Sequence, residues 1–169
     1  QEMGRKFKIA FSSSDRDSAY TFIHDLGFIP RIQDGKRGFK VLIGGGLGAQ
    51  PFLALTAYEF LEEDLLIPFT EAVLRVFDRY GERARRHKAR LKFLLADVGL
   101  EELLRLINEE WPSLSHKHYK IDTSVIQQPD PQPEGRTYPI QNTSDEAGYS
   151  LWLHTNVTEQ KQKGFYTIG

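Results

Sequence analysis

Apolar residues recur at helical spacing in two stretches near the middle of the chain. One is residues 69–80, which follow Pro68, and the other is residues 100–111, which lie between Gly99 and Pro112. Proline suits the first turn of a helix, and glycine commonly ends one. Both stretches therefore predict helices with one face buried in a core.

Residues 83–97 predict another helix, which carries six basic residues in its first ten positions. At about 100° per residue, the basic side chains fall on two roughly opposite stripes, with Arg83, Arg86 and Arg90 on one and Arg85, Lys88 and Lys92 on the other. Each stripe taken alone is either a solvated face or part of an anion site. Two stripes on one helix favour a functional role for one of them.

Near the start of the chain, residues 5–13 alternate in a way that predicts a strand. Phe7, Ile9 and Phe11 share the face that we expect to meet the core, and Lys6 and Lys8 share the other face. Two ammonium groups about 7 Å apart on one strand face can converge on a small anion.

Residues 28–32 and 39–43 predict a hairpin, because they flank Asp34-Gly35, a strong tight-turn signal. A short helix over residues 18–26 is predicted before the hairpin, and the glycine-rich residues 44–51 predict irregular backbone after it. Together these elements predict an α+β fold, in which a mixed β-sheet has its helices packed on one side and an extended C-terminal tail follows.

The character of the sequence changes after residue 112. Residues 113–148 contain prolines without apolar periodicity and predict an extended linker. Residues 149–155 and 165–168 predict two strands. We therefore expect a folded domain over residues 4–112, a linker over 113–148, and the truncated start of a further domain over 149–169.

Composition limits the classes of function. The 22 basic residues nearly balance the 23 acidic ones, so we expect no nucleic-acid partner. No apolar run approaches the roughly 20 residues that span a bilayer, and no leader is evident, which predicts a cytoplasmic protein with no membrane partner. The chain has no cysteine, and His116 and His118 lack a third ligand at useful spacing, so we expect no metal ligands here.

The glycine-rich run suggests a remote alternative, a dinucleotide-binding module. Gly44, Gly46 and Ala49 match the pattern G-x-G-x-x-A after a strand. The preceding strand is the return arm of a hairpin, however, and Pro51 stands where the phosphate-binding helix should already be under way. This alternative predicts a helix beginning at about Ala49.

Three ordered motifs carry a family resemblance: "RKFKIAF", "GFKVLIGGGLG", and "GERARRHKARLKFLL" followed by "GLEELL". Together they resemble the first of the two pseudo-repeated half-domains of siroheme-dependent assimilatory sulfite and nitrite reductases. The resemblance covers about residues 4–110. The family usually has Leu-Pro where this chain has Met3-Gly4.

The resemblance implies roles for individual residues. Lys6 and Lys8 match the lysines that bind the anionic substrate and supply positive charge and protons. The positions that match cofactor-binding residues are Arg5 near the macrocycle, Arg90 at the siroheme carboxylates with Arg83 and Arg86 as weaker candidates, and Gly45, Gly46 and Leu47 in the glycine loop.

The resemblance also implies an activity, the six-electron reduction of sulfite to sulfide by siroheme and a [4Fe-4S] cluster whose ligands lie outside this chain. Plant-type nitrite reductases have asparagine at the position of Lys8, so lysine favours sulfite, with reduction of nitrite to ammonia as the alternative. The implied partners are the remainder of the same polypeptide and an electron donor, either ferredoxin or an NADPH flavoprotein. We expect the fragment alone to be inactive. Besides the reductase and the dinucleotide-binding module, a third interpretation is structural. In it, the charged residues of this chain only support the other half of a duplicated protein.

Overall fold

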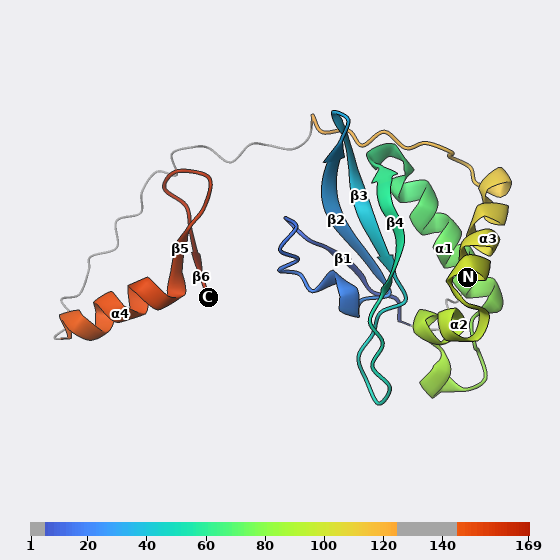
Figure 1. Cartoon of the computed structure of the whole chain (residues 1–169), viewed down its shortest axis with the longest axis horizontal. Coiled ribbons are helices and arrows are strands. Elements are labelled where there is room, and N and C mark those ends of the chain that lie inside the picture. The colour runs from blue at the N-terminus through green and yellow to red at the C-terminus, as the bar shows by residue number, and fades with distance from the viewer. Residues whose placement is uncertain (1–5, 125–144) are drawn as a thin grey trace. The chain divides into compact units, whose positions relative to one another are not determined.

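The computed structural model describes residues 6–124 and 145–169. It divides into two compact units, Gln1–Ile121 and Asp122–Gly169, which are described separately below (Figure 1). Within the described ranges, the structure contains no helix that is both long enough and apolar enough to span a membrane.

The first unit is built on a four-stranded sheet with the order β1-β2-β3-β4. Its strands are β1 (Ile9–Phe11), β2 (Leu26–Gln33), β3 (Lys36–Ile43) and β4 (Leu55–Glu62). β1 pairs in parallel with β2, and the other neighbours are antiparallel, so the sheet is mixed as predicted. The hairpin turn is also confirmed, because Asp34 and Gly35 have the positive φ angles, 51° and 74°, that the tight turn requires.

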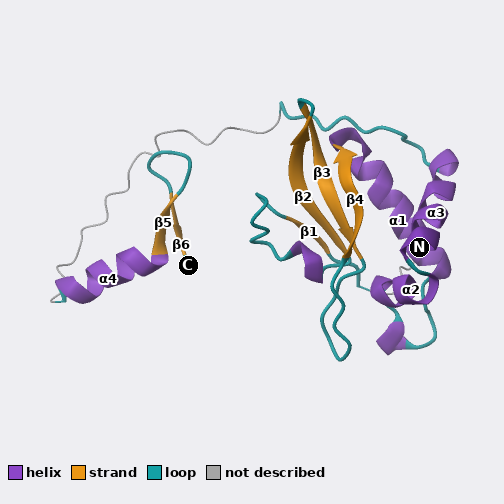
Figure 2. Cartoon of the chain, in the orientation of Figure 1, coloured by secondary structure: helices purple, strands orange, loops and turns teal. Residues whose placement is uncertain are grey.

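Three helices pack on the same side of this sheet (Figures 1 and 2). They are α1 (Leu66–Tyr80), α2 (Leu91–Val98) and α3 (Leu100–Glu110). The periodicities that predicted α1 and α3 correspond to buried faces, and the two helices contribute Phe69, Val73 and Leu103 to one core cluster with Phe28 and other sheet residues. Burial of these apolar faces is the main source of stability for such layers.

The opposite face of β2 is covered by a short 3₁₀ turn, Thr21–Ile23. The sequence predicted a longer helix over residues 18–26, which is wrong. Asp17 binds the backbone N–H and the hydroxyl group of Thr21, with an Oδ2 to Oγ1 distance of 2.9 Å, and so fixes the turn. Thr21 is fully buried directly over Gly27, where a methyl group would lie 2.6 Å from the Thr21 Cβ.

The first strand turns the predicted face toward the core, but the side chains on that face are less buried than expected. Phe11 stacks on Phe28 of the core with 5.0 Å between ring centroids, and Phe7 packs partly against the same core. Ile9 and Phe11 nevertheless stay 41% and 53% exposed. β1 is an edge strand, at the end of the sheet away from the helices (Figure 1), so apolar character alone did not predict burial.

The helix predicted over residues 83–97 begins only at Leu91. Glu82 accepts hydrogen bonds from the backbone N–H groups of Ala84 and Arg85, which holds the chain in a turn. A 3₁₀ turn, Arg86–Lys88, follows, and Arg90 is extended. Repulsion between closely spaced cations further disfavours a helix here. The two basic stripes therefore do not exist as predicted.

The second unit contains α4 (Glu146–Asn156) and a hairpin of β5 (Val157–Glu159) and β6 (Tyr166–Ile168). A strand was predicted over residues 149–155, which is wrong. Asp145 accepts a hydrogen bond from the Gly148 N–H and caps the helix. Among the described residues of this unit none is buried, so tertiary burial does not select the helix.

We expect Gly27→Ala to destabilise the first unit by about 1–3 kcal/mol, because the added methyl group meets a turn that Asp17 holds in place. Urea denaturation measures this change in the free energy of unfolding. Gln33→Ala, at the exposed end of the same strand, is the control and should change it by less than about 0.5 kcal/mol. Equal effects of the two substitutions would contradict the close packing of the turn on β2.

Candidate functional site

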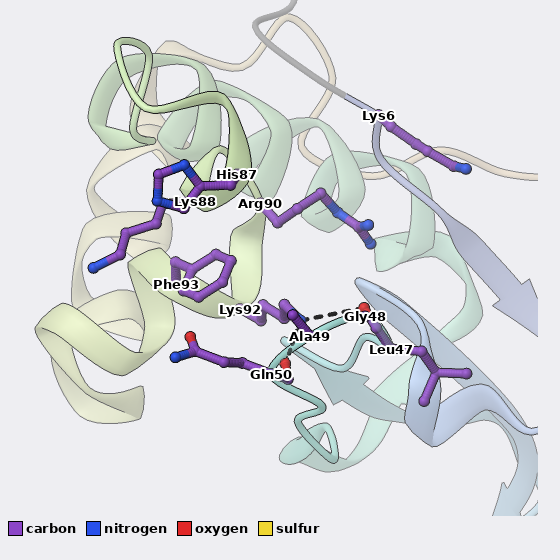
Figure 3. A pocket seen from close by; sticks show the side chains of 10 residues that line it. All are labelled: Lys6, Leu47, Gly48, Ala49, Gln50, His87, Lys88, Arg90, Lys92 and Phe93. Atoms are coloured by element: carbon purple, nitrogen blue, oxygen red, sulfur yellow. Dashed lines mark hydrogen bonds between the residues drawn. The ribbon is translucent and has the colours of Figure 1, made fainter.

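A cavity of about 520 Å³ lies where three segments of the first unit meet. These segments are the chain just before β1, the loop between β3 and β4, and the basic segment that leads into α2 (Figure 3). The lining residues are Lys6, Leu47, Gly48, Ala49, Gln50, His87, Lys88, Arg90, Lys92 and Phe93. Among the described residues of this lining, none is acidic, so the cavity concentrates positive charge in a chain of net charge −1.

Arg90 is held by a buried carboxylate. Asp25 has no exposed surface, and its two oxygens accept hydrogen bonds from Arg90 Nε at 3.2 Å and Nη2 at 2.7 Å. Such two-point pairing fixes the plane of the guanidinium group. Arg90 itself precedes the first turn of α2 and has an extended backbone.

Lys6 and Lys8 precede β1 and are both exposed. Lys6 lines the same cavity as Arg90, so the structure brings these two predicted residues together (Figure 3). Lys8 is not in the lining among the described residues. Its backbone is fixed on both sides, because its N–H donates to Asp25 Oδ2 at 2.9 Å and its carbonyl accepts from the Leu26 N–H at 3.1 Å.

The glycine-rich loop is shaped by its own packing. Gly46 and Phe52 exchange backbone hydrogen bonds of 3.0 and 2.9 Å, which closes residues 46–52 into a compact loop. A side chain at Gly45 would meet the carbonyl groups of Phe22 and His24, and one at Gly46 would lie 3.2 Å from Lys92 Cδ. Of the three loop residues that the resemblance singled out, Leu47 lines the cavity among the described residues.

Lys92 is 3% exposed, although the sequence placed it on a charged stripe. Its ammonium group donates to the carbonyls of Leu47 at 3.3 Å and Gln50 at 2.5 Å, and lies 5.4 Å and 5.1 Å from the ring centroids of Phe52 and Phe93. Burial, and then repulsion from Arg90, lowers the pKa of Lys92 from its usual value. This cation therefore supports the loop from within.

Arg83 and Arg86 lie apart from Arg90 in their contacts. Arg83 pairs with Asp78 at the end of α1, and within the described part of the chain neither Arg83 nor Arg86 lines the cavity. The predicted stripe fails because residues 83–90 do not form an α-helix. Arg5 lies outside the described residues.

Two important residues were not anticipated as part of the site. Asp25 has no motif around it, and only the fold brings it to Arg90, 65 positions along the chain. Lys92 did have a signal, because it lies between Leu91 and Phe93 within an apolar stretch. Among the described residues, the structure shows no group of three or more potential metal ligands, and His118 instead pairs with Asp64 at 2.7 Å.

Comparison with known proteins gives the family. Residues 1–114 match the family model described as "Nitrite and sulphite reductase 4Fe-4S domain". Because the match covers more than half of the chain, the chain belongs to this family, whose members are siroheme and [4Fe-4S] oxidoreductases. The family predicted from the three sequence motifs is thereby confirmed.

Relatives include both kinds of reductase. The "Sulfite reductase [NADPH] hemoprotein beta-component" is 40% identical in Nitrosomonas europaea and 36% identical in Xanthomonas oryzae pv. oryzae, each over 107 residues, 59% of this chain and 19% of the relative. "Ferredoxin--nitrite reductase" of Synechococcus elongatus is 34% identical over 110 residues, 63% of this chain and 21% of the relative. The chain thus spans about a fifth of their length.

The fold also matches a solved structure, that of the Mycobacterium tuberculosis NirA protein. The TM-score is 0.60 at 30% sequence identity, over 71% of this chain and 22% of that one. The predicted α+β fold with a mixed sheet is confirmed. The dinucleotide-binding alternative is wrong, because β3 returns to the antiparallel strand β4 and the described residues 44–54 contain no helix.

We expect Lys92→Met to loosen the loop, because two carbonyl groups lose a charged donor that the apolar replacement does not restore. The backbone N–H groups of Gly46 and Phe52 should exchange with solvent about tenfold faster, measured by hydrogen exchange and NMR. Lys88→Met removes a charge from the same cavity without touching those carbonyls, and is the control. Unchanged exchange in Lys92→Met would contradict a supporting role.

The turn that positions the basic segment should weaken only in acid. Hydrogen bonds, first from the Arg85 side chain and then from the backbone of Arg85 and Ala84, lower the pKa of Glu82 to about 2. This pKa is below the usual value of about 4.3 for a glutamate. The stabilisation by ionised Glu82 is therefore complete above about pH 4.3 and is lost as the pH falls toward 2. Carbon-13 NMR of the carboxyl group measures the pKa directly. Arg85→Ala should raise it, whereas a normal pKa in the unmodified chain would contradict the turn.

Proposed function

We propose that this chain supplies the substrate-binding lysines and the cofactor-carboxylate contacts of a siroheme and [4Fe-4S] sulfite reductase, which reduces sulfite to sulfide with six electrons. The supporting observation is the cavity that Lys6 and Arg90 share, with Lys88, Lys92 and His87 in its wall. Cations converging on one cavity suit an anionic substrate beside a cofactor with carboxylate side chains.

The residues present fit siroheme. Its carboxylates call for guanidinium and ammonium donors, and its flat ring calls for close approach of backbone and apolar side chains. The cavity offers Arg90 for the first and the loop at Leu47 for the second. Bound siroheme would supply electrons to the substrate at its iron. Arg90 would hold a carboxylate with the part of its guanidinium group that Asp25 does not use. For Arg5, Arg83, Arg86, Gly45 and Gly46 the cofactor role stays a prediction.

Lys6 and Lys8 would act on the substrate. An ammonium group near a reacting anion stabilises the negative charge that develops on a departing oxygen, and its proton can leave with that oxygen as water. Lys6 lines the cavity, and the backbone of Lys8, two residues further on, is held by Asp25. Both side chains are exposed here, so they can orient toward a bound anion without breaking an internal contact.

The remainder of the enzyme would come from a longer polypeptide, since the relatives are about five times as long as the matched region. This chain has no cysteine, so thiolate ligands for a cluster would have to lie elsewhere. Residues 149–169 would begin the second half-domain. The names of the relatives point to an NADPH-dependent partner or to ferredoxin as the electron donor.

Lys6→Ala in the complete, cofactor-loaded enzyme tests the proposal. We expect KM for sulfite to rise about tenfold, as for the loss of one charge-assisted hydrogen bond. Steady-state kinetics with sulfite measure this effect. Lys36→Ala removes the same charge at the exposed β2–β3 hairpin, where Lys36 pairs with Glu62, and should leave KM unchanged. Unaltered kinetics in Lys6→Ala would instead favour a supporting role for this half.

Nitrite reduction to ammonia is the second candidate, favoured by the relative from Synechococcus elongatus that is named a nitrite reductase. Lysine rather than asparagine at position 8 favours sulfite. The ratio of kcat/KM for sulfite to that for nitrite, measured on the same enzyme preparation, decides between the two substrates.

A further inference from the structure

Asp25 bonds to all three segments that form the cavity. Its carboxylate accepts from the Lys8 N–H at 2.9 Å and from two nitrogens of Arg90. Its backbone carbonyl accepts from the Gly44 N–H at 2.9 Å, at the start of the glycine-rich loop. One buried residue thus ties the arm that carries Lys6, the guanidinium group of Arg90 and the loop that carries Leu47.

The pairing also decides which part of Arg90 can meet a ligand. Asp25 uses Nε and Nη2, so Nη1 is the guanidinium nitrogen that this carboxylate leaves for the cavity. An arginine side chain is long and mobile, and orienting it only when a ligand arrives lowers affinity. A side chain that is already oriented avoids this loss. A buried carboxylate that also accepts from the Lys8 N–H, on a residue whose backbone carbonyl accepts from the Gly44 N–H, is a rigid anchor for that purpose.

We propose that Asp25 is a positioning residue, which orients Arg90 and the Lys6 arm toward one ligand carboxylate or anion without touching that ligand. This inference rests on the proposed function for its ligand, but its geometry can be tested independently of any activity. It assigns no chemistry to Asp25 itself, because the carboxylate is fully buried and its oxygens are already engaged.

The first test uses the unmodified chain of 169 residues. The Arg90 Nε–H proton should exchange with water at least tenfold more slowly than that of Arg37, whose ion pair with Glu63 is exposed and uses Nη2. Nitrogen-15 NMR measures both rates in one sample. Equal rates would overturn the proposal without the need for any variant.

The second test is a double-mutant cycle of Asp25→Asn and Arg90→Gln, with uroporphyrin, a metal-free tetrapyrrole carboxylate, as the probe and fluorescence as the readout. We expect Asp25→Asn alone to weaken binding about tenfold and to speed exchange of the Arg90 Nε–H and the Lys8 N–H. In the Arg90→Gln background, the same substitution should have little further effect on binding.

If Asp25→Asn weakens binding by the same factor with and without Arg90, the two losses of affinity are additive. Additive losses would overturn the proposal, because Asp25 would then act on binding without acting through Arg90. Unchanged exchange at Arg90 and Lys8 in a folded Asp25→Asn chain would overturn it as well. If the unmodified chain holds Arg90 rigidly but does not bind uroporphyrin, the result contradicts the proposed carboxylate contact and leaves the anchoring role supported. The two failures are therefore distinguishable.

Discussion

The arrangement of the cavity depends on one buried ion pair, between Asp25 and Arg90. A carboxylate without exposed surface loses its hydration, and other groups must replace the hydrogen bonds of the lost water. Here the replacements come from Arg90 and from the Lys8 N–H, which are distant from each other in the sequence. Removing either partner would take a hydrogen bond from a buried carboxylate. Moving the segment of Lys8 away from that of Arg90 therefore costs free energy.

The cations of the cavity are not equivalent. Lys92 is committed to two carbonyl groups of the loop, and Arg90 is shared with Asp25. Within the described part of the chain, Lys6 and Lys88 show no ion pair of this kind. The cavity therefore has two kinds of cation. Lys92 and Arg90 are held by internal contacts and shape its walls, whereas Lys6 and Lys88 are less constrained and can adapt to an anion. Counting basic residues in the sequence does not reveal this division.

Local signals predicted the elements whose causes are local. The Asp34-Gly35 turn and the apolar faces of α1 and α3 follow from backbone preference and periodicity within a few residues. β4 was not predicted, because its exposed and buried positions do not alternate cleanly behind the glycine-rich loop. The basic side chains of residues 83–90 have helical spacing, but such spacing forms stripes only where a helix forms, and α2 begins only at Leu91. The role of Asp25 depends on contacts across the fold and could not be predicted from its neighbours.

The glycine-rich loop shows how a family motif can have more than one physical cause. A side chain at Gly45 would strike backbone carbonyl groups, so that position requires glycine even without a ligand, whereas one at Gly46 would press on the Lys92 side chain and displace it. Leu47 differs, because it is exposed and lines the cavity. Loss of cofactor affinity on replacing Gly45 would therefore not distinguish a lost contact from a distorted loop. Leu47 is the loop position at which a change in affinity would report on the cavity itself, since its side chain is 60% exposed.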